Sequence, residues 1–540
     1  MNQLPPSNSL MHINWSESLQ QLAQKYGERL IATDGAKARL TFDELNLYAH
    51  WVARHLSMHG IQSSEPVASL LDNQLPAIWV TYGIKLNGAA EVPLNFNSTQ
   101  DEILWCAAVA KFKWIVTYES KAEELKKLGF QVLSIEHLLS SLEEFKVSNT
   151  WVAQTLESVN ANDWGRILFT SGTTGKPKGV VYTHQRRWIA EQMLKASMPF
   201  IPQKGAKLLL MTPFVHGASL MTFAWADFGA EVVLVNGVDL PKITPLLASE
   251  QLQYIFAPPT VLGKLMLGHE GRTFKGVKCI FTGTQPLSKG LYDKALEMFG
   301  PVVRVTYGKS ECINPITVLT PEQTHDFYQA VPLPAGACVG WPQPGVEMKI
   351  VPQEEGEDEG MQVGNASPEA ASKKWVQGEI YLRAPQMSNF LINPEGRIEH
   401  ESEGWHSTGD LGYFDDKGRL MLTGRIADVI KTGGYRVNPD EIELLLVGSS
   451  HWDYVCITSL PSEYWGEVII AVVEGAKENF ADEMSLRLKA LSKHKQPRIT
   501  VSFKALPRNP QGKISRKKVR EMVLSTHQYL DGPYPKLELN

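Results

Sequence analysis

Residues 167–182 have the sequence Ile-Leu-Phe-Thr-Ser-Gly-Thr-Thr-Gly-Lys-Pro-Lys-Gly-Val-Val-Tyr. Two apolar segments, each typical of a buried strand, flank a loop of glycine, serine and threonine. Glycine lets the backbone bend so that its N–H groups face an anion, and the hydroxyl groups add further donors. Lys178 adds positive charge. The stretch therefore predicts a loop that binds phosphate groups, and its many donors suit a triphosphate.

Two other interpretations of this loop are weaker. A Walker A loop has four residues between its glycines and a Ser or Thr directly after its lysine. Here Gly172 and Gly175 are separated by only two residues, and Pro177 follows Lys176. A flexible linker rich in glycine and serine is the second alternative, but such linkers are rarely flanked by two apolar strands.

Helix and strand signals alternate on the N-terminal side of the loop. Thr41 and Glu44 have the spacing of a capping box at the start of a helix. The alternation favours an α/β fold with parallel strands. The predicted strands are residues 66–71, 91–94 and 114–117, and a predicted helix spans residues 79–86.

Length and composition limit the classes of protein to consider. A chain of 540 residues suggests two to four structural units, since one domain takes about 100–200 residues. The formal charge of −5 argues against a protein whose main role is to coat nucleic acid or an anionic membrane. The five cysteines form no Cys-x-x-Cys pair, which favours neither a disulfide framework nor a cysteine metal site and indicates a reducing compartment. We therefore expect a cytoplasmic protein.

No segment of the sequence is expected to cross a membrane. Residues 1–15 lack the positive and apolar regions of a signal peptide. The stretch 208–226 carries no formal charge, but Pro213, His216 and Gly217 interrupt it. A buried strand, a loop and a buried helix explain this stretch better than a membrane span.

Two changes in composition bear on domain organisation. Residues 353–374 are rich in Glu, Gly, Ala and Ser, which predicts a solvated, mobile loop. A new α/β unit begins near residues 424–425, so we expect domains over 1–424 and 425–540. Within the second domain, the predicted strands are residues 455–459 and 468–473, and a predicted helix spans residues 484–493.

Six segments, spread in order along the chain, resemble the motifs of the adenylate-forming (AMP-binding) superfamily, which includes acyl- and aryl-CoA ligases, adenylation domains and firefly luciferase. The resemblance extends from about residue 25 to about residue 522. One departure is Ser310, which stands where the family has threonine. The matching segments are residues 170–179, 307–311, 340–351, 408–410, 424–443 and 507–514.

The resemblance implies the fold and the nucleotide site. It implies a large N-terminal domain of layered α/β subdomains with a small β-rich subdomain, followed by a small mobile α+β domain. Glu311 resembles the carboxylate that organises Mg²⁺, because a hard cation bridging phosphates prefers oxygen ligands. Tyr307 resembles the residue that covers adenine, and Asp410 the carboxylate that accepts from both ribose hydroxyls. The residues implied in ATP or AMP binding are Thr170, Ser171, Gly172, Thr173, Thr174, Gly175, Lys178, Thr284, Gln285, Thr306, Tyr307, Gly308, Ser310, Asp410 and Arg425.

These assignments depend on the motifs and not on single residues. Taken alone, Glu311 is more simply a solvated surface residue and Tyr307 a core residue. Because both residues lie within motifs that follow the family's order, the functional interpretation is favoured for each.

Lys513 resembles the lysine that acts when the acid is activated. Attack of a carboxylate oxygen on the α-phosphate brings two anions together, and a cation that touches both stabilises the developing charge. The alternative is a basic surface or nucleic-acid patch formed with Arg516, Lys517 and Lys518. The net negative charge and the preceding segment 508–512 disfavour that alternative.

The family alternates between two orientations of its C-terminal domain, one for adenylation and one for thioester formation. Lys431 resembles a residue of the thioester-forming face and is a predicted catalytic residue, while Gly433 and Gly434 resemble the backbone beside the pantetheine tunnel. The usual Asp or Lys of the hinge is replaced by Ala427, and Asp428 is a candidate substitute.

The acyl pocket implied by the resemblance contains His216, Gly217, Thr284 and Thr306. A structural role for the histidine is the alternative. Amino-acid-selecting adenylation domains place an Asp where Gly217 stands, so an α-amino acid is disfavoured. The two threonines fill space that a long chain would use, which favours a small, short-chain or aromatic acid.

We therefore interpret the chain as an ATP-dependent acid–CoA ligase that uses ATP, Mg²⁺ and CoA and forms an acyl-adenylate. The alternative is a ligase that loads the phosphopantetheine arm of an acyl carrier protein. A non-catalytic protein that kept the fold is disfavoured by the joint presence of Lys513, Glu311 and Asp410.

Overall fold

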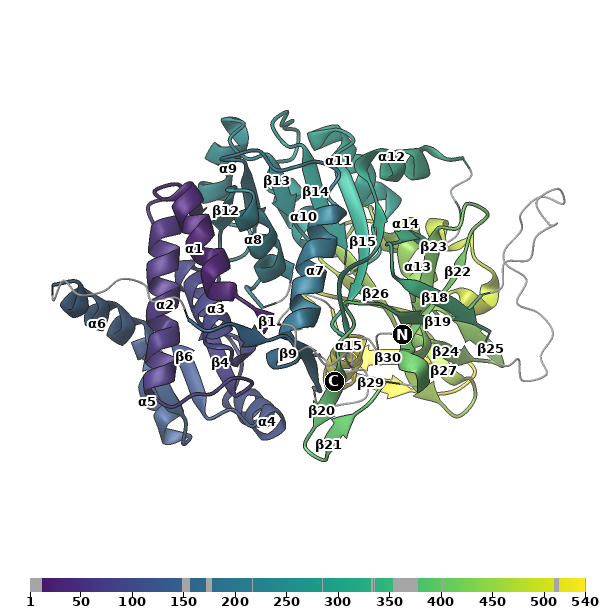
Figure 1. The fold of residues 1–540 in the computed structure, drawn as a ribbon. Coiled ribbons are helices and arrows are strands. Elements are labelled where there is room, and N and C mark those ends of the chain that lie inside the picture. The colour runs from purple at the N-terminus through teal and green to yellow at the C-terminus, as the bar shows by residue number, and fades with distance from the viewer. Residues whose placement is uncertain are drawn as a thin grey trace, which may run out of the picture. The chain divides into compact units, whose positions relative to one another are not determined.

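The structure is a computed structural model (Figure 1). The chain divides into two compact units. The first unit comprises Met1–Thr284, Met298–Ile316 and Ala384–His400, and the second comprises Gln285–Glu297, Thr317–Arg383 and Glu401–Asn540. The structure describes residues 12–147, 156–170, 177–215, 217–283, 285–331, 334, 336–352, 377–400, 402–508 and 514–539.

Two expectations on domain organisation are not decided by this division. The predicted mobile loop 353–374 lies outside the described residues. The predicted boundary between residues 424 and 425 falls within the second unit and stays a prediction.

The first unit alternates helices with strands. Its helices are α1 (Trp15–Tyr26), α2 (Phe42–Met58), α3 (Leu75–Asn87), α4 (Gln100–Ala110), α5 (Glu119–Lys127), α6 (Ile135–Val147), α7 (His184–Ala196), α8 (Gly217–Asp227), α9 (Leu240–Ala248) and α10 (Pro259–Leu267). Its strands are β1 (His12–Ile13), β2 (Leu30–Thr33), β3 (Arg39–Thr41), β4 (Pro66–Leu71), β5 (Ala90–Asn95), β6 (Trp114–Thr117), β7 (Gln131–Ser134), β8 (Val159–Asn160), β9 (Trp164–Phe169), β10 (Gly179–Thr183), β11 (Lys207–Leu210), β12 (Glu231–Leu234), β13 (Tyr254–Phe256), β14 (Cys279–Gly283), β15 (Val303–Lys309), β20 (Phe390–Asn393) and β21 (Gly396–Ile398). Strand β16 (Cys312–Leu319) runs from the first unit into the second.

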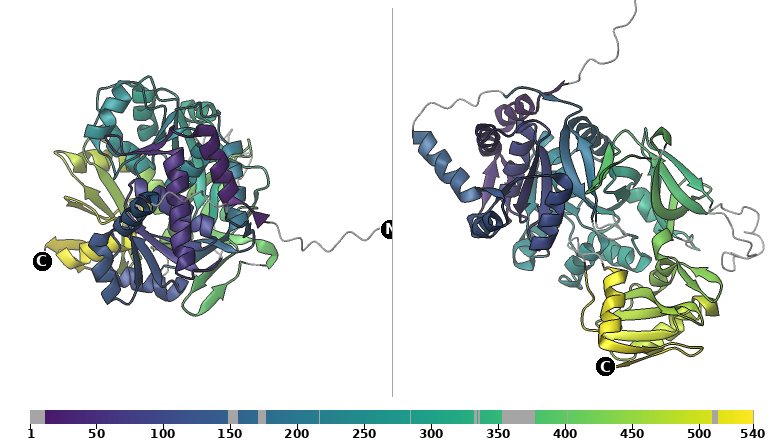
Figure 2. Two further views of the ribbon diagram at one scale, coloured as in Figure 1. Left: turned by 60° about the vertical axis from the view of Figure 1, so that its left-hand side comes forward. Right: turned by 90° about the horizontal axis from the view of Figure 1, so that it is seen from below.

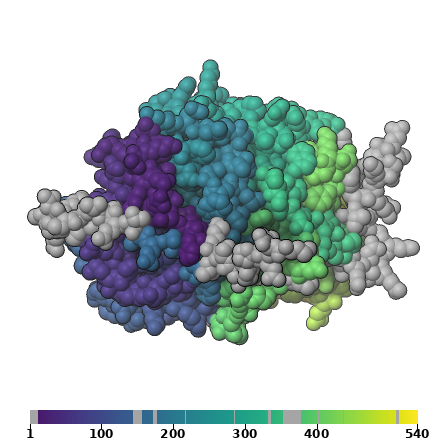
Figure 3. All heavy atoms as spheres, viewed as in Figure 1, coloured from purple at the N-terminus to yellow at the C-terminus, as the bar shows by residue number. Residues whose placement is uncertain are grey.

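Two large sheets and the two-stranded sheet β1-β8 form the first unit. One sheet has the order β21-β20-β10-β9-β5-β4-β6-β7, in which β5, β4, β6 and β7 are parallel. The other contains β15-β14-β13-β11-β12-β2, again parallel, with β3 antiparallel at its end. Figure 2 shows the N-terminal helices, coloured purple, packed against the strands of this unit, and α1 and α2 form part of the face seen in Figure 3. The predicted α/β fold with parallel strands is confirmed.

The core of the first unit joins its helices to both sheets. Leu45 of α2, Ile78 of α3 and Trp225 of α8 are buried in one cluster with Leu208 of β11 and Val232 of β12. Their burial removes apolar surface from water, which is the main stabilising contribution to such a fold. The phosphate-loop strands belong to another cluster, in which Ile167 of β9 and Val181 of β10 are buried with residues of β4 and β5.

Local signals in the sequence match the observed elements closely. Thr41 caps α2, and Glu44 completes the capping box in both directions. The uncharged stretch 208–226 divides into β11, a loop and the buried helix α8, as predicted. No described helix has the length and the apolar character needed to cross a membrane.

The second unit is built mainly from antiparallel strands. Its helices are α11 (Lys289–Phe299), whose last two residues belong to the first unit, α12 (Pro321–Gln329), α13 (Pro439–Leu446), α14 (Phe480–Leu488) and α15 (Arg516–Thr526), with short 3₁₀ turns η1 (Ser402–Gly404), η2 (Ile426–Asp428) and η3 (Lys493–Lys495). Its strands are β17 (Ala337–Pro342), β18 (Glu347–Val351), β19 (Gly378–Arg383), β22 (His406–Phe414), β23 (Leu420–Arg425), β24 (Ile430–Thr432), β25 (Tyr435–Val437), β26 (Tyr454–Ser462), β27 (Gly466–Glu474), β28 (Ile499–Phe503), β29 (His527–Leu530) and β30 (Lys536–Leu539).

The sheet β25-β24-β27-β26, with β28 parallel to β27, has helices on both faces. Ile457 and Ile469 are buried in a cluster that includes residues of α13 and α14, whereas Cys456 and Ile470 are buried in a cluster with residues of α15. This alternation follows from the two-residue period of a strand. The mixed α and β character predicted for this part of the chain is confirmed.

One predicted helix has different bounds. The predicted helix 484–493 begins earlier, at Phe480, and ends at Leu488. After Leu488 the backbone tightens into turns in which Ala490 N donates to Arg487 O and Leu491 N donates to Leu488 O. Phe480 packs against the core on this face of the sheet, which accounts for the earlier start.

Candidate active site

The ends of the predicted phosphate loop form a closed hairpin. Strands β9 and β10 are antiparallel, with Phe169 opposite Gly179. Thr170 N donates to Lys178 O at 3.1 Å, and the Trp105 indole donates to Pro177 O at 2.8 Å. The described ends of the loop are thus fixed by hydrogen bonds, while residues 171–176 lie outside the described residues.

A tight turn holds the second motif. Ser310 and Glu311 connect β15 to β16, so Glu311 lies at the end of a strand in a half-buried position. Tyr307 is buried in β15. Gly308 is required by space, because a Cβ atom there would lie 1.5 Å from Asn314 Oδ1.

The hairpin and the turn are joined directly. The Tyr182 hydroxyl, on β10, donates to Ser310 O at 2.5 Å. The Ser388 N–H donates to Glu311 O at 2.8 Å, and the Asn389 N–H donates to Val181 O at 2.8 Å. The segment before β20 therefore connects both motifs.

Sequence reasoning missed Ser388 and Asn389 as positioning residues. They are far from either motif along the chain, and no spacing pattern marks them. Tyr182 lies within the quoted loop stretch, but its partner is 128 residues away.

The predicted ribose motif pairs with the predicted hinge arginine in the second unit. Asp410 of β22 lies opposite Arg425 of β23, and Arg425 Nε donates to Asp410 Oδ1 at 3.1 Å. The Asp410 side chain is 7% exposed and that of Arg425 is 48% exposed. The arginine therefore orients a nearly buried carboxylate while remaining accessible itself.

The predicted thioester-forming face is a hairpin turn of the second unit. Lys431 is an exposed residue of β24, and its N–H donates to Glu467 Oε2 at 2.7 Å. Gly433 and Gly434 have φ values of +56° and +85°, which suit glycine in a tight hairpin turn. Gly433 N also donates to Trp465 O at 2.8 Å, so the turn is anchored to the neighbouring loop.

The predicted acyl segment is tightly packed around Gly217. A Cβ atom at Gly217 would lie 2.4 Å from Cζ of Phe256, so no larger residue fits without displacement of that ring. The expectation that an α-amino acid is disfavoured stays a prediction.

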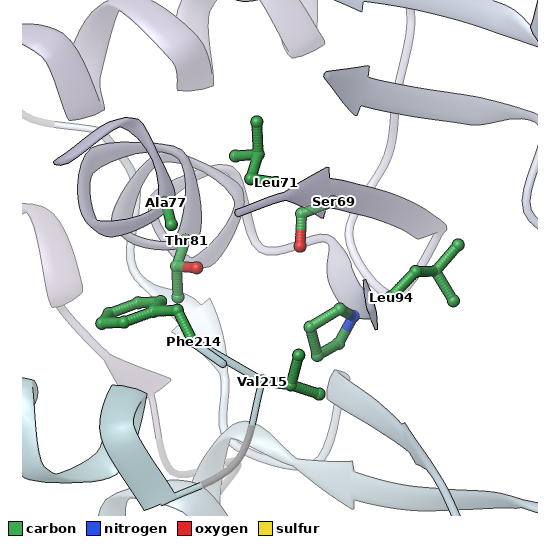
Figure 4. Close-up of a pocket in the computed structure, with 8 residues that line it drawn as sticks. Ser69, Leu71, Ala77, Thr81, Leu94, Phe214 and Val215 are labelled. Atoms are coloured by element: carbon green, nitrogen blue, oxygen red, sulfur yellow. The ribbon is translucent and has the colours of Figure 1, made fainter. Parts of the chain in front are cut away.

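A small cavity lies beside this segment (Figure 4). Figure 4 shows Ser69 and Thr81 on one side of it and Phe214 and Val215 on the other. The two hydroxyls donate to Oε1 of the fully buried Glu91 at 3.0 Å and 2.7 Å.

A buried ion pair connects the phosphate-loop hairpin to the acyl segment. Arg166 of β9 pairs with Glu91 Oε2 at 3.2 Å. The same guanidinium donates to Val215 O at 2.6 Å, directly before His216 in the chain. The strand that enters the phosphate loop therefore holds the backbone of the predicted acyl pocket.

The remaining predicted site residues differ in their burial and in whether the structure describes them. Thr306 is buried, and its hydroxyl donates to Tyr307 O at 3.3 Å. Gln285 is half-buried in the second unit. The predicted site residues outside the described residues are Ser171, Gly172, Thr173, Thr174, Gly175, His216, Thr284 and Lys513, and their roles stay predictions.

Comparison with known proteins identifies the family. The family model described as AMP-binding enzyme matches residues 19–390, which is more than half of the chain. The chain belongs to the AMP-binding enzyme family. The resemblance stated from the motifs is thereby confirmed.

Relatives of this AMP-binding enzyme are similar over nearly its whole length. A 2-succinylbenzoate–CoA ligase from Listeria monocytogenes is 26% identical over 511 residues, covering 94% of this chain and 99% of the relative. The ligase of the same name from Bacillus cereus is 25% identical over 488 residues, covering 90% of this chain and 94% of the relative.

Solved structures share the fold of this AMP-binding enzyme. An o-succinylbenzoate–CoA synthetase from Bacillus subtilis, in complex with its acyl-adenylate, superimposes with a TM-score of 0.76 at 24% identity and covers 98% of this chain and all (100%) of its own. ATP-bound MatB from Rhodopseudomonas palustris gives 0.77 at 23% identity, covering 95% of this chain and 99% of its own.

Proposed function

We propose that the protein is an ATP-dependent carboxylic acid–CoA ligase that acts on an aromatic acid. The observation that carries this proposal is the similarity to 2-succinylbenzoate–CoA ligases over 94% of the chain, which is longer than the region matched by the family model. The proposal also draws on the joined phosphate-loop hairpin and Glu311 turn of the first unit.

The reaction has two steps. A carboxylate oxygen of the acid attacks the α-phosphorus of ATP, and the bond to the bridging oxygen breaks so that pyrophosphate leaves. The sulfur of CoA then attacks the acyl carbon as the thiol proton is lost. The carbon–oxygen bond breaks, and AMP leaves with the oxygen that came from the acid.

The residues of the first unit bind and orient the triphosphate in this proposal. The hairpin around Thr170 and Lys178 supplies backbone and cationic groups, and Glu311 offers carboxylate oxygens next to it. Mg²⁺, when bound, neutralises phosphate charge, and one or two carboxylates with the phosphates are its usual ligands. The Tyr182–Ser310 hydrogen bond supports a shared site, because it fixes Glu311 relative to the loop.

Residues of the second unit serve the nucleoside and the second step. Asp410, oriented by Arg425, accepts hydrogen bonds from the ribose hydroxyls. Lys513 stabilises charge on the α-phosphate during adenylation. Lys431, Gly433 and Gly434 line the route of the acceptor thiol.

An aromatic acid fits the residues around the acyl segment better than an amino acid. Gly217 contacts the ring of Phe256 and leaves no room for an acidic side chain that would bind an α-ammonium group. Arg166 fixes the adjoining Val215 carbonyl, so the segment keeps a defined shape. The preference for an aromatic acid comes from the 2-succinylbenzoate–CoA ligases to which the chain is similar.

Mass spectrometry of a reaction with Mg·ATP, CoA and a mixed panel of acids tests the proposal. The panel contains 2-succinylbenzoate, benzoate, short-chain acids, a long fatty acid and amino acids. We expect a new thioester of an aromatic acid and equimolar AMP. If no acid yields either a thioester or an acyl-adenylate, the proposal is wrong.

The acceptor and the compartment complete the proposal. CoA is the acceptor, and an acyl-adenylate that accumulates without a thioester would instead favour a carrier protein. A reducing cytoplasm is proposed because all five cysteines are buried and free.

A further inference from the structure

The guanidinium of Arg516 binds several partners at once, and none of the steps proposed above assigns it a role. It is the first residue of α15, and its guanidinium contacts three carboxylates. Nη1 donates to Asp428 Oδ2 at 2.5 Å, and Nη2 donates to Glu443 Oε2 at 2.7 Å and to Asp440. Nε donates to the backbone carbonyl of Ile457 at 3.0 Å, so every nitrogen of the guanidinium is used.

The partners of Arg516 lie on two elements of the predicted hinge region. Asp428 ends the turn η2, directly after Ala427. Asp440 and Glu443 belong to α13, and the Glu443 carboxylate also accepts from Ile457 N at 2.8 Å. One arginine therefore joins the hinge turn, α13 and strand β26 to the start of α15.

Both sides of the segment that carries Lys513 are anchored. On the N-terminal side, Arg508 pairs with both oxygens of Glu474, at 3.1 Å and 2.6 Å. Arg508 and Ile514 form a β-bridge, and Ser515 caps α15 by accepting from Lys518 N. On the C-terminal side, Arg516 is three residues beyond Lys513.

We propose that Arg516 is a positioning residue for the adenylation step, which ties the lysine-bearing segment to the hinge turn through Asp428. This inference rests on the proposed function, in which Lys513 acts in adenylation. The planar guanidinium reaches carboxylates on two elements at once, and the ammonium of a lysine does not reproduce that geometry. Asp428 thereby provides the side-chain contact at the hinge that Ala427 lacks.

Separate measurement of the two half-reactions distinguishes a positioning role of Arg516 in adenylation from a general structural role. Adenylation is measured as pyrophosphate exchange into ATP that depends on the acid. Thioester formation is measured from synthetic acyl-adenylate and CoA, a step that does not use Lys513. Arg516→Lys and Arg516→Gln are compared with wild type, with Lys513→Gln as the reference for complete loss of the cation.

We expect exchange to fall about 10- to 100-fold in both Arg516 variants, because a misplacement of about 1 Å costs a catalytic group that much. Thioester formation from the acyl-adenylate stays within about 3-fold of wild type. Asp428→Asn shows the same pattern with a smaller loss. This variant weakens only the contact between Arg516 and the hinge turn, and the contacts of Arg516 with Asp440 and Glu443 of α13 remain. It therefore also tests the inference if the Arg516 variants do not fold.

Arg520→Gln is the matched control on the same helix. Its guanidinium donates to Ser459 Oγ at 3.1 Å and to no hinge carboxylate in the described contacts, so both half-reactions are expected to be unchanged. Equal losses in both half-reactions, or no loss in exchange for the Arg516 and Asp428 variants, would overturn the inference. A wild-type protein inert in both half-reactions would instead contradict the proposed function.

Discussion

His184 shows how one buried side chain makes the stability of the first unit depend on pH. The Trp15 indole donates to His184 Nδ1 at 3.2 Å, so Nε2 carries the proton and donates to Gly88 O at 3.3 Å. Burial, with a smaller contribution from the charge of Arg187, lowers the pKa of His184 to about 3. The imidazole is therefore neutral in the folded protein at ordinary pH.

Stability is expected to fall as the medium is acidified. An unfolded histidine titrates near pH 6.5, so between that pH and 3 the unfolded chain binds a proton that the folded chain does not. At pH 5 the loss from His184 is about 2 kcal/mol relative to pH 8. Urea unfolding at pH 8 and pH 5 measures it, with His184→Gln as the variant in which this part of the difference disappears. An unchanged difference in that variant would contradict the assignment.

Gly217 is expected to affect activity with the acid through the ring of Phe256. Gly217→Ala places a methyl group against the Phe256 ring, whose nearest atom lies 2.4 Å from the added Cβ. We expect kcat/KM for the acid to fall about 10- to 100-fold, because overpacking shifts neighbouring groups at a cost of about 1–3 kcal/mol. The KM for ATP changes little.

Rescue tests the cause of this loss. Phe256→Leu in the same chain removes the ring atoms that the new methyl group meets. The double variant is expected to recover part of the lost kcat/KM for the acid. A double variant that is no better than Gly217→Ala would show that the loss does not come from this contact.

At the scale of elements, the hydrogen bond from Tyr182 to Ser310 holds the phosphate-loop hairpin against the Glu311 turn. Tyr182→Phe removes that bond and leaves Ser310 O without this donor, at a cost of about 1 kcal/mol. We expect the KM for Mg·ATP to rise about 3- to 10-fold, measured by steady-state kinetics at saturating acid and CoA.

Tyr118→Phe is the matched control for Tyr182→Phe. It removes a hydroxyl of the same unit that donates to Asp72 Oδ1 at 2.7 Å, and Asp72 has no side-chain hydrogen bond to the loop or the turn among the described contacts. If both variants raise the KM for Mg·ATP equally, the Tyr182 bond has no special role in the site.

The elements themselves were largely predictable from the sequence. Strands at 66–71 and 114–117 and the capping box of Thr41 and Glu44 depend on neighbouring residues, which a local pattern records. The end of α14 was not predictable in the same way. Apolar residues continue beyond Leu488, but the backbone there forms tight turns.

In the molecule as a whole, the sequence motifs indicated which residues form the site, but they did not indicate the hydrogen bonds that connect these residues. Arg166, Ser388 and Asn389 join the loop, the turn and the acyl segment through hydrogen bonds to backbone groups. Such contacts depend on the packing of distant segments, and no local pattern encodes them. The pairing of Asp410 with Arg425 was equally hidden, since it follows from strand register.

Activation through an acyl-adenylate fixes the fate of each carboxylate oxygen of the acid, so isotopic labelling of those oxygens tests it. An aromatic acid found to be a substrate is labelled with ¹⁸O in both carboxylate oxygens and converted with Mg·ATP and CoA. We expect one ¹⁸O in AMP and one in the thioester, because the attacking oxygen leaves with the α-phosphate. Label in inorganic phosphate, with ADP as the nucleotide product, would contradict it.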